Sequence, residues 1–387
     1  MEQVAPLAGL LVLEIADGVV AYCGRLLASL GAEVVLIEPP EGCFHRRGVE
    51  EELIRGITPS FAWLHTGKRS VLIDPSKSDD VAMLEKLAGD ADVVLLGTGM
   101  EWHDELRLSL DDLREKNPGL VAASISPFGS DGPYQSYRSS SSVNFAMGGL
   151  MNISGNAGEP PVLAPGDQST VVAGSQLAVG ILAAIMEREY SGLGQDVEVS
   201  VQEAFCAQEN IVSSFTGDGW VGERTGSQHR VAAPGSIFPC KDGFVHLFVS
   251  PVQIGAWERL IDWMGASAGV LSQEEWSNPR YRRSNILELD RIIRSWTRGW
   301  SKQEFYIEAQ KRHIPCAPVN SMSDFVEDPH IVARGFFQSV PAGKNPSYFY
   351  PAPLIIINGS RRGNESSAPD LGDGNEIYAA KIKDLGA

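Results

Sequence analysis

Short apolar runs alternate with helical patterns along the first half of the chain. The runs are short, rich in Val, Leu and Ile, and bounded by Gly, Asp or Asn, as is typical of strands buried on both faces of a sheet. The predicted strands are Leu10–Ile15, Glu33–Ile37, Ser70–Ile73, Asp92–Leu96 and Leu120–Ser126, and the predicted helices between them are Ala21–Leu30, Asp79–Leu87 and Asp111–Lys116. This repetition predicts a large Rossmann-like α/β domain, with a mostly parallel sheet covered by helices on both faces.

A long apolar helix is predicted over Thr170–Tyr190, with Ala, Leu, Ile and Val through its middle. A helix that is apolar on most sides is expected in a core or in a subunit interface. It is followed by a predicted strand, Val197–Ser200, and a predicted helix, Val201–Ser214. The Gly-rich stretch Gly217–Gly226 then breaks the pattern and indicates a linker.

A different pattern begins near residue 233. Ser236–Pro239 and Phe244–Val249 flank an Asp242-Gly243 turn and predict a hairpin. Amphipathic helices are expected at Ile254–Met264, Ile286–Thr297 and Lys302–Arg312, which makes this a smaller α+β domain. The expected organisation is a first part of the large domain at 1–216, a linker at 217–232, the small domain at 233–320 and a return segment at 321–387.

The net charge and the cysteine pattern exclude several classes of protein. The 387 residues carry 32 Lys and Arg against 49 Asp and Glu, a net charge of −17, which disfavours nucleic acid and anionic membranes as partners. The five Cys form no C-x-x-C pair, so neither a disulfide framework nor a zinc site is indicated. The N-terminal residues lack a signal-peptide pattern, and no 18 consecutive residues are all apolar. We therefore expect a cytoplasmic protein that does not enter a membrane.

The common catalytic signatures are missing from the sequence. No G-x-G-x-x-G follows the first predicted strand, so a dinucleotide site lacks its fingerprint. The seven His have no metal-ligand spacing, and no G-x-S-x-G elbow surrounds a serine. The serines at Ser139–Ser142 are interpreted as a solvated loop. We expect neither a metal nor a prosthetic group.

Ten segments, in order over nearly the whole chain, resemble the family III CoA-transferases, the group of formyl-CoA transferase and carnitine CoA-transferase, which also includes the α-methylacyl-CoA racemases. The matching segments are Pro6–Glu14 (PLAGLLVLE), Leu30–Pro40 (LGAEVVLIEPP), Gly67–Asp74 (GKRSVLID), Ala91–Val94 (ADVV), Ser126–Gly129 (SPFG), Asp131–Tyr134 (DGPY), Gly180–Ala184 (GILAA), Gly192–Gln195 (GLGQ), Pro239–Gly243 (PCKDG) and Ile314–Val319 (IPCAPV).

The resemblance implies both a fold and a reaction. The fold is a split large domain of parallel α/β type with a smaller second domain, and two subunits interlock like links of a chain. The reaction moves CoA from an acyl-CoA thioester to a carboxylic acid, with the thioester as substrate and no prosthetic group. In the family, an aspartate attacks the thioester and passes through an anhydride and an aspartyl-CoA intermediate, which is nucleophilic catalysis by a carboxylate.

The family aspartate does not align with an aspartate here. Counted back without a gap from Gly180-Ile181-Leu182, its position falls on Thr170, whose hydroxyl cannot form the anhydride. The nearest carboxylate is Asp167, three residues earlier. Asp167 has two interpretations that the sequence leaves open: the N-cap of the helix that follows, or a shifted nucleophile.

Other departures affect the same pocket. Ser140 stands where the racemases have a histidine of their acid/base pair, so proton abstraction is disfavoured. The loop after the first strand and the segment after Leu96 also lack the family's residues. Some heteromeric members, such as the benzylsuccinate CoA-transferases, pair a subunit that has the aspartate with one that lacks it, and this chain resembles the latter.

Four basic residues are candidates for holding the CoA phosphates. Lys68 and Arg69 follow the family pattern, and Arg46 and Arg47 lie past Glu38-Pro39-Pro40. Arg and Lys suit phosphate by fork geometry and by point charge, although adjacent basic residues are also common on solvated surfaces.

Three hypotheses about function follow. The chain is the non-nucleophilic subunit of a heteromeric CoA-transferase with a paralogous catalytic partner; or it is a self-sufficient homodimer that uses Asp167; or it is a non-catalytic scaffold subunit.

Overall fold

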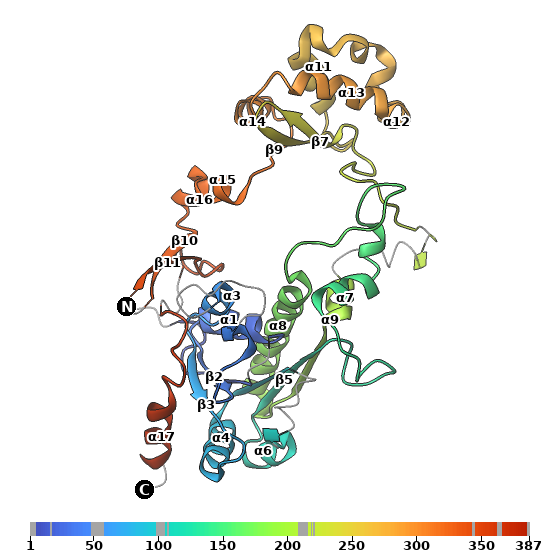
Figure 1. Cartoon of the computed structure of the whole chain (residues 1–387). Helices are drawn as coiled ribbons and strands as arrows, with labels where there is room; N and C mark the ends of the chain where they lie inside the picture. The colour runs from blue at the N-terminus through green and yellow to red at the C-terminus, as the bar shows by residue number, and fades with distance from the viewer. Residues whose placement is uncertain are drawn as a thin grey trace. The chain divides into compact units, whose positions relative to one another are not determined.

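The chain folds into two compact units, seen in a computed structural model (Figure 1). The structure describes residues 5–15, 18–47, 58–97, 105–106, 108–207, 216–217, 219, 221–342, 345–361 and 366–384. The first unit consists of Met1–Met151, Leu163–Trp220 and Val332–Ala387, and the second of Asn152–Val162 and Val221–Ile331. The domain bounds expected from composition, at residues 216, 232 and 320, stay a prediction.

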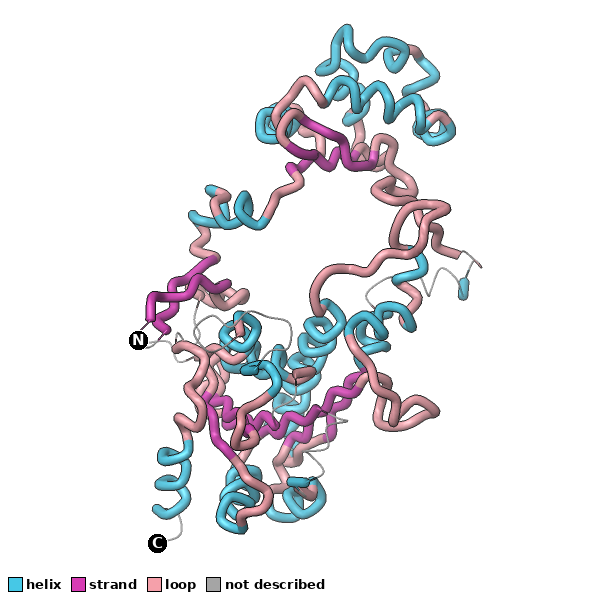
Figure 2. Tube along the Cα trace, in the orientation of Figure 1, coloured by secondary structure: helices cyan, strands magenta, loops and turns pink. Residues whose placement is uncertain are grey.

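A six-stranded sheet is the centre of the first unit (Figure 2). Its strands are β1 (Leu11–Ile15), β2 (Glu33–Glu38), β3 (Arg69–Leu72), β4 (Val93–Gly97), β5 (Val121–Ser126) and β6 (Asp196–Ser200). They lie in the order β3-β2-β1-β4-β5-β6, and every neighbouring pair is parallel. The strand order reverses between β1 and β4, and the carboxyl ends of strands at such a point are where open α/β sheets bind ligands.

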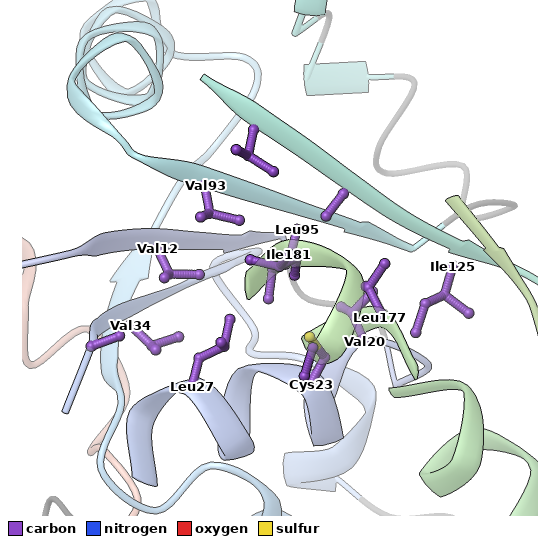
Figure 3. Close-up of a cluster of buried hydrophobic side chains, with 14 of the residues drawn as sticks. Val12, Val20, Cys23, Leu27, Val34, Val93, Leu95, Ile125, Leu177 and Ile181 are labelled. Atoms are coloured by element: carbon purple, nitrogen blue, oxygen red, sulfur yellow. The ribbon is translucent and has the colours of Figure 1, made fainter. Parts of the chain in front are cut away.

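Alternate residues of each strand face opposite layers of helices, as the pleat requires. Val12 and Val34 contact one apolar cluster with helices α1 (Ala21–Ser29) and α8 (Gln168–Ser191) (Figure 3). Leu13 and Val35 contact a second cluster with α4 (Ser78–Asp90), α6 (Leu110–Lys116) and α17 (Asn375–Asp384). The expected α/β fold with a parallel sheet covered on both faces is confirmed.

Helix α8 is the long apolar helix that the sequence predicts. Its hydropathy of 1.8 over an 18-residue window makes it long and apolar enough to cross a membrane by composition, although no 18 consecutive residues are all apolar. Leu177 and Ile181 are fully buried against the sheet and α1. A core helix passes the same composition test, and the buried face of α8 is that of a core helix. Its other face carries Val179 and Met186, which are 64% and 68% exposed.

Shorter elements surround this core. In the first unit they are α2 (Phe44–Arg47), α3 (Pro59–Leu64), α7 (Ser141–Met147), α9 (Val201–Cys206) and a hairpin of β10 (Phe337–Ala342) and β11 (Asn345–Pro351), which the sequence did not predict. A 3-10 turn, Met151–Ile153, lies at the boundary between the two units. Helix α9 ends at Cys206, and the predicted continuation over 208–215 lies outside the described residues.

The second unit is built on an antiparallel sheet of β7 (Gly235–Cys240), β8 (Gly243–Phe248) and β9 (Cys316–Pro318). The predicted hairpin pairs β7 with β8, and Cys240 faces Gly243 at its turn. Its helices are α11 (Ala256–Met264), α12 (Pro279–Ser284), α13 (Ile286–Thr297), α14 (Lys302–Lys311), α15 (Met322–Val326) and, at the edge of the unit, α16 (Pro329–Ala333), with 3-10 segments Gly265–Ser272 and Glu274–Ser277.

Candidate functional site

The start of α8 is the place where the resemblance expects a nucleophile. Asp167 is the N-cap residue, but its carboxylate makes no capping hydrogen bond and is exposed. Instead, the half-buried Thr170 hydroxyl donates to the Asp167 carbonyl oxygen at 2.9 Å. Asp167 therefore stands at the N-cap position, but its side chain does not make the hydrogen bond to a first-turn N–H by which an N-cap stabilises a helix. Thr170 lies in the first turn of the helix.

Serine hydroxyls join the start of α8 to α7. Buried Ser169 donates to the Ser141 hydroxyl at 2.9 Å, and Ser139 donates to the Asn144 side chain at 2.9 Å. Ser140 caps α7, since its hydroxyl accepts a hydrogen bond from the Val143 backbone N–H. In the described residues, no carboxylate or imidazole is bonded to these hydroxyls, so no general base is positioned to activate them.

A buried ion pair lies beneath the carboxyl end of β1. The Lys68 ammonium donates to both Glu14 carboxylate oxygens, at 2.8 and 2.7 Å, and to the Ala21 carbonyl at 3.0 Å. Both side chains are fully buried. Burial lowers the pKa of Lys68, and the Glu14 carboxylate opposes that shift. The three acceptors match the three ammonium protons, so contact with CoA by Lys68 would require this pair to break.

Two histidines extend the ion pair toward the end of β1. His65 Nδ1 lies 3.3 Å from the Lys68 ammonium, and His65 Nε2 lies 3.3 Å from His45 Nδ1. The ring of His45 in turn lies against Gly18, where a Cβ would come within 3.0 Å of its Nε2. Burial first, and then the charge of Lys68, hold the pKa of His65 well below its usual value, so His65 is neutral at physiological pH.

A second buried ion pair holds the segment after β2. The Arg46 guanidinium binds Glu38 at 2.7 to 3.1 Å, donates to the Pro369 carbonyl at 3.0 Å and lies 4.0 Å from the Phe61 ring centroid. Glu38 also accepts from the Ser70 hydroxyl and the Cys43 backbone N–H. Burial raises the pKa of this carboxyl, but these partners together bring it below its usual value. Arg46 thus joins the C-terminal segment to β2.

The remaining basic candidates differ in exposure. Arg69 starts β3 with its side chain 55% exposed, and its guanidinium lies 3.4 Å from Asp373. The side chain of Arg47 lies outside the described residues, as do Ala16, Asp17 and the segment after Gly97. Arg69 is therefore the described basic candidate whose charge reaches solvent.

Sequence reasoning missed the acidic partners and both histidines. A glutamate inside a strand that is buried on both faces must find a cation, because an unpaired buried carboxylate is costly. Glu14 in LLVLEI and Glu38 in VVLIE carried that signal. Their cations, Lys68 and Arg46, were noticed only as possible phosphate ligands.

The described residues hold no set of three or more His, Cys, Asp or Glu side chains placed to bind a metal ion. The strand order of the parallel sheet reverses between β1 and β4, and polar groups lie at the carboxyl end of β1. This arrangement is typical of α/β proteins that bind a ligand at the carboxyl ends of their strands.

The chain belongs to the CoA-transferase family III, whose sequence profile matches residues 7–375. It is similar to the succinate–glutarate CoA-transferase of Agrobacterium fabrum, with 27% identity over 98% of this chain and 96% of that one. It is also similar to the succinyl-CoA:(R)-benzylsuccinate CoA-transferase subunit BbsE of Thauera aromatica, with 29% identity over 82% of this chain and 80% of that one.

A solved structure agrees on the fold. The crystal structure of a CAIB/BAIF family protein from Brucella suis has a TM-score of 0.88 and 24% identity, and covers 98% of this chain and 100% of that one. The resemblance read from the ten sequence segments is confirmed. The family is one of transferases that use CoA thioesters and carboxylic acids as substrates.

Proposed function

We propose that this chain is the non-nucleophilic subunit of a heteromeric CoA-transferase. The observation that carries the proposal is in the first turn of α8, where the Thr170 hydroxyl donates to the Asp167 carbonyl. Counted back without a gap from Gly180, Thr170 falls at the position of the family's aspartate. A hydroxyl bonded in this way, with no base at its oxygen among the residues that the structure describes, cannot replace a carboxylate that forms an anhydride. The partner is a paralogous subunit that supplies the aspartate.

The substrates proposed are an acyl-CoA donor and a dicarboxylic acid acceptor. The names of two similar proteins include succinate, glutarate and benzylsuccinate, all of which are dicarboxylic acids. We propose Arg69 as the residue that contacts the CoA phosphates, because it is the described basic candidate whose guanidinium reaches solvent. The cytoplasm, which holds CoA thioesters, is the proposed location.

Replacing Asp167 by Asn is expected to leave the activity of the complete assembly within a few-fold of wild type. The carboxylate is exposed and makes no capping bond, so the exchange removes no interaction that the structure describes. Loss of a covalent nucleophile would instead remove several orders of magnitude in kcat. CoA transfer by the co-purified assembly measures the difference.

Trapping distinguishes the alternatives. In the presence of acyl-CoA, the aspartyl-CoA thioester should form on the partner subunit and not on this chain. Hydroxylamine would convert that thioester to a hydroxamate, and borohydride would reduce it to an alcohol, with release of CoA in both cases, so the modified aspartate marks the subunit that reacts. An adduct at Asp167, together with inactive Asp167→Asn in an intact assembly, would restore the self-sufficient homodimer. A partner that turns over equally fast without this chain would contradict both the proposed subunit role and a scaffold that completes the partner's fold and pocket.

The exposed face of α8 predicts that the chain does not exist as a monomer. Val179, Met186 and Tyr190 are 64%, 68% and 91% exposed along one helix, and apolar surface of this kind marks an interface. We propose an interlocked dimer as the assembly and expect sedimentation velocity to show a dimer or larger at micromolar concentration. A stable, folded monomer under those conditions would contradict this.

A further inference from the structure

Arg25 is a buried cation without an acidic partner in the described part of the chain. It lies in the middle of α1 and is 93% buried, since its relative exposure is 7%. No described oxygen accepts a hydrogen bond from its guanidinium, and no described carboxylate lies within ion-pair distance. The guanidinium nitrogens keep some contact with solvent, because none of them is a fully buried atom without a partner. A charge that is mostly buried and has no counter-charge favours the binding of an anion.

The guanidinium lines a pocket on the outer side of α1. The pocket is formed by Tyr22, Arg25, Leu26 and Ser29 of α1, Trp63 of α3 and the segment Pro351–Leu354, and its cavity volume is about 40 Å³. The Tyr22 and Trp63 rings lie 5.6 Å apart. Neither the Tyr22 hydroxyl nor the Trp63 indole N–H has a hydrogen-bond partner among the described residues. Three kinds of donor therefore line one small pocket.

The chemistry of the lining selects the kind of anion. Donors come from α1 and α3, whereas two of the four residues of the opposite wall are prolines without an N–H group. The other nearby cation on that wall, Arg361, already donates to the Pro353 and Leu354 carbonyls. One guanidinium fork facing an apolar wall suits a planar, singly charged carboxylate with a short carbon chain. A phosphate dianion would want further cations or backbone N–H groups. The cavity volume of about 40 Å³ is far below that of a small-molecule site, so the cavity has room for a single group such as one carboxylate.

The pocket also borders helix α8, whose first turn contains Thr170. Tyr22 lies against α8 at Gly174, where an added Cβ would come within 3.2 Å of the Tyr22 Cβ. Gly174 is one helical turn after Thr170. Tyr22 thus contacts both the Arg25 pocket and the first turns of α8.

We propose that this pocket binds one carboxylate group of a small organic acid, with the Arg25 guanidinium as its bidentate partner. The site rests on the pocket itself and does not depend on which subunit supplies the nucleophile. Where the acid is the dicarboxylic substrate of the proposed function, Arg25 holds the carboxylate that does not react with CoA.

Calorimetric titration of the full chain with succinate, glutarate and inorganic phosphate, in the absence of CoA, tests this. The wild-type chain should bind the acids, and phosphate should not compete. Arg25→Gln should weaken acid binding roughly tenfold to a hundredfold, because a charge-assisted bidentate contact is lost. Arg25→Lys keeps the charge but not the guanidinium fork, so its affinity for the acids should lie between those of wild type and Arg25→Gln. It also tests the proposal if the Gln variant does not fold. Arg291→Gln, an exposed arginine of the second unit, is the matched control and should bind as wild type.

Three outcomes would overturn the proposal. In the first, wild type and Arg25→Gln bind the acids with equal affinity; in the second, phosphate binds more tightly than either acid and its binding depends on Arg25. In the third, wild type binds no acid and the Arg25→Gln assembly dissociates in sedimentation. The last result would assign the counter-charge to a second copy of the chain. Because no CoA is present, Arg25-dependent acid binding by an assembly that lacks transferase activity would overturn the proposed function alone.

Discussion

Replacing Lys68 by Met is expected to lower the free energy of unfolding of the first unit by about 3–5 kcal/mol. The substitution keeps the length of the side chain but leaves the Glu14 carboxylate fully buried without its cation. It also removes the hydrogen bond to the Ala21 carbonyl, which lies at the start of α1. Urea denaturation, monitored at fixed protein concentration, measures the change.

Two further variants show whether the buried pair is responsible. Arg69→Met removes the neighbouring cation, which is exposed and whose oxygen partner on Asp373 lies 3.4 Å away, so the expected loss is below about 1 kcal/mol. Adding Glu14→Leu to Lys68→Met should restore much of the lost stability, because an apolar pair leaves no buried charge. A loss below 1 kcal/mol in Lys68→Met itself would mean that water reaches Glu14 and that the pair is not closed.

Replacing Gly194 by Ala is expected to destabilise the first unit by about 3 kcal/mol, the upper part of the usual range for overpacking. Gly194 follows α8 and donates its N–H to the Pro118 carbonyl at 2.7 Å. A Cβ at this position would overlap the Leu120 carbonyl oxygen and lie 2.7 Å from the carbonyl carbon of Gly119. These are backbone atoms next to β5, so neither can rotate away.

Gly89→Ala should have the opposite sign and is the matched control. Gly89 lies inside α4, and a Cβ there meets no atom within 4 Å. Because Ala is the better helix former, the expected gain is about 0.5–1 kcal/mol. Thermal unfolding of both variants should move in opposite directions, and a shared direction would show that the packing around Gly194 yields by moving the strand.

The buried Glu38 carboxylate makes the stability of the first unit depend on pH. The partners of Glu38 hold its pKa below the usual value, so its contribution to stability is present at neutral pH and is lost as the pH falls below the value of a free glutamate.

The short apolar runs between helical patterns by themselves determined the sheet. Runs such as LLVLEI and DVVLL are too short for helices and too apolar for exposed strands, so they predict a parallel sheet regardless of the rest of the chain. The β10–β11 hairpin was missed because both strands contain proline, at Pro341, Pro346 and Pro351, and proline within a run argues against a strand.

Only the tertiary structure decided what the charged residues do. Lys68 and Arg69 are neighbours in sequence and looked equivalent. Lys68, which lies just before β3, reaches inward to Glu14, whereas Arg69, the first residue of β3, reaches outward to Asp373. Glu14 and Lys68 are 54 residues apart, and Arg46 reaches the Pro369 carbonyl 323 residues away. The local pattern of apolar and polar residues predicts which face of a strand or helix a residue lies on. The partner of a buried charge depends instead on which distant segment of the chain packs against that residue. The Arg25 pocket has the same origin, since one wall comes from α1 and the other from the C-terminal segment.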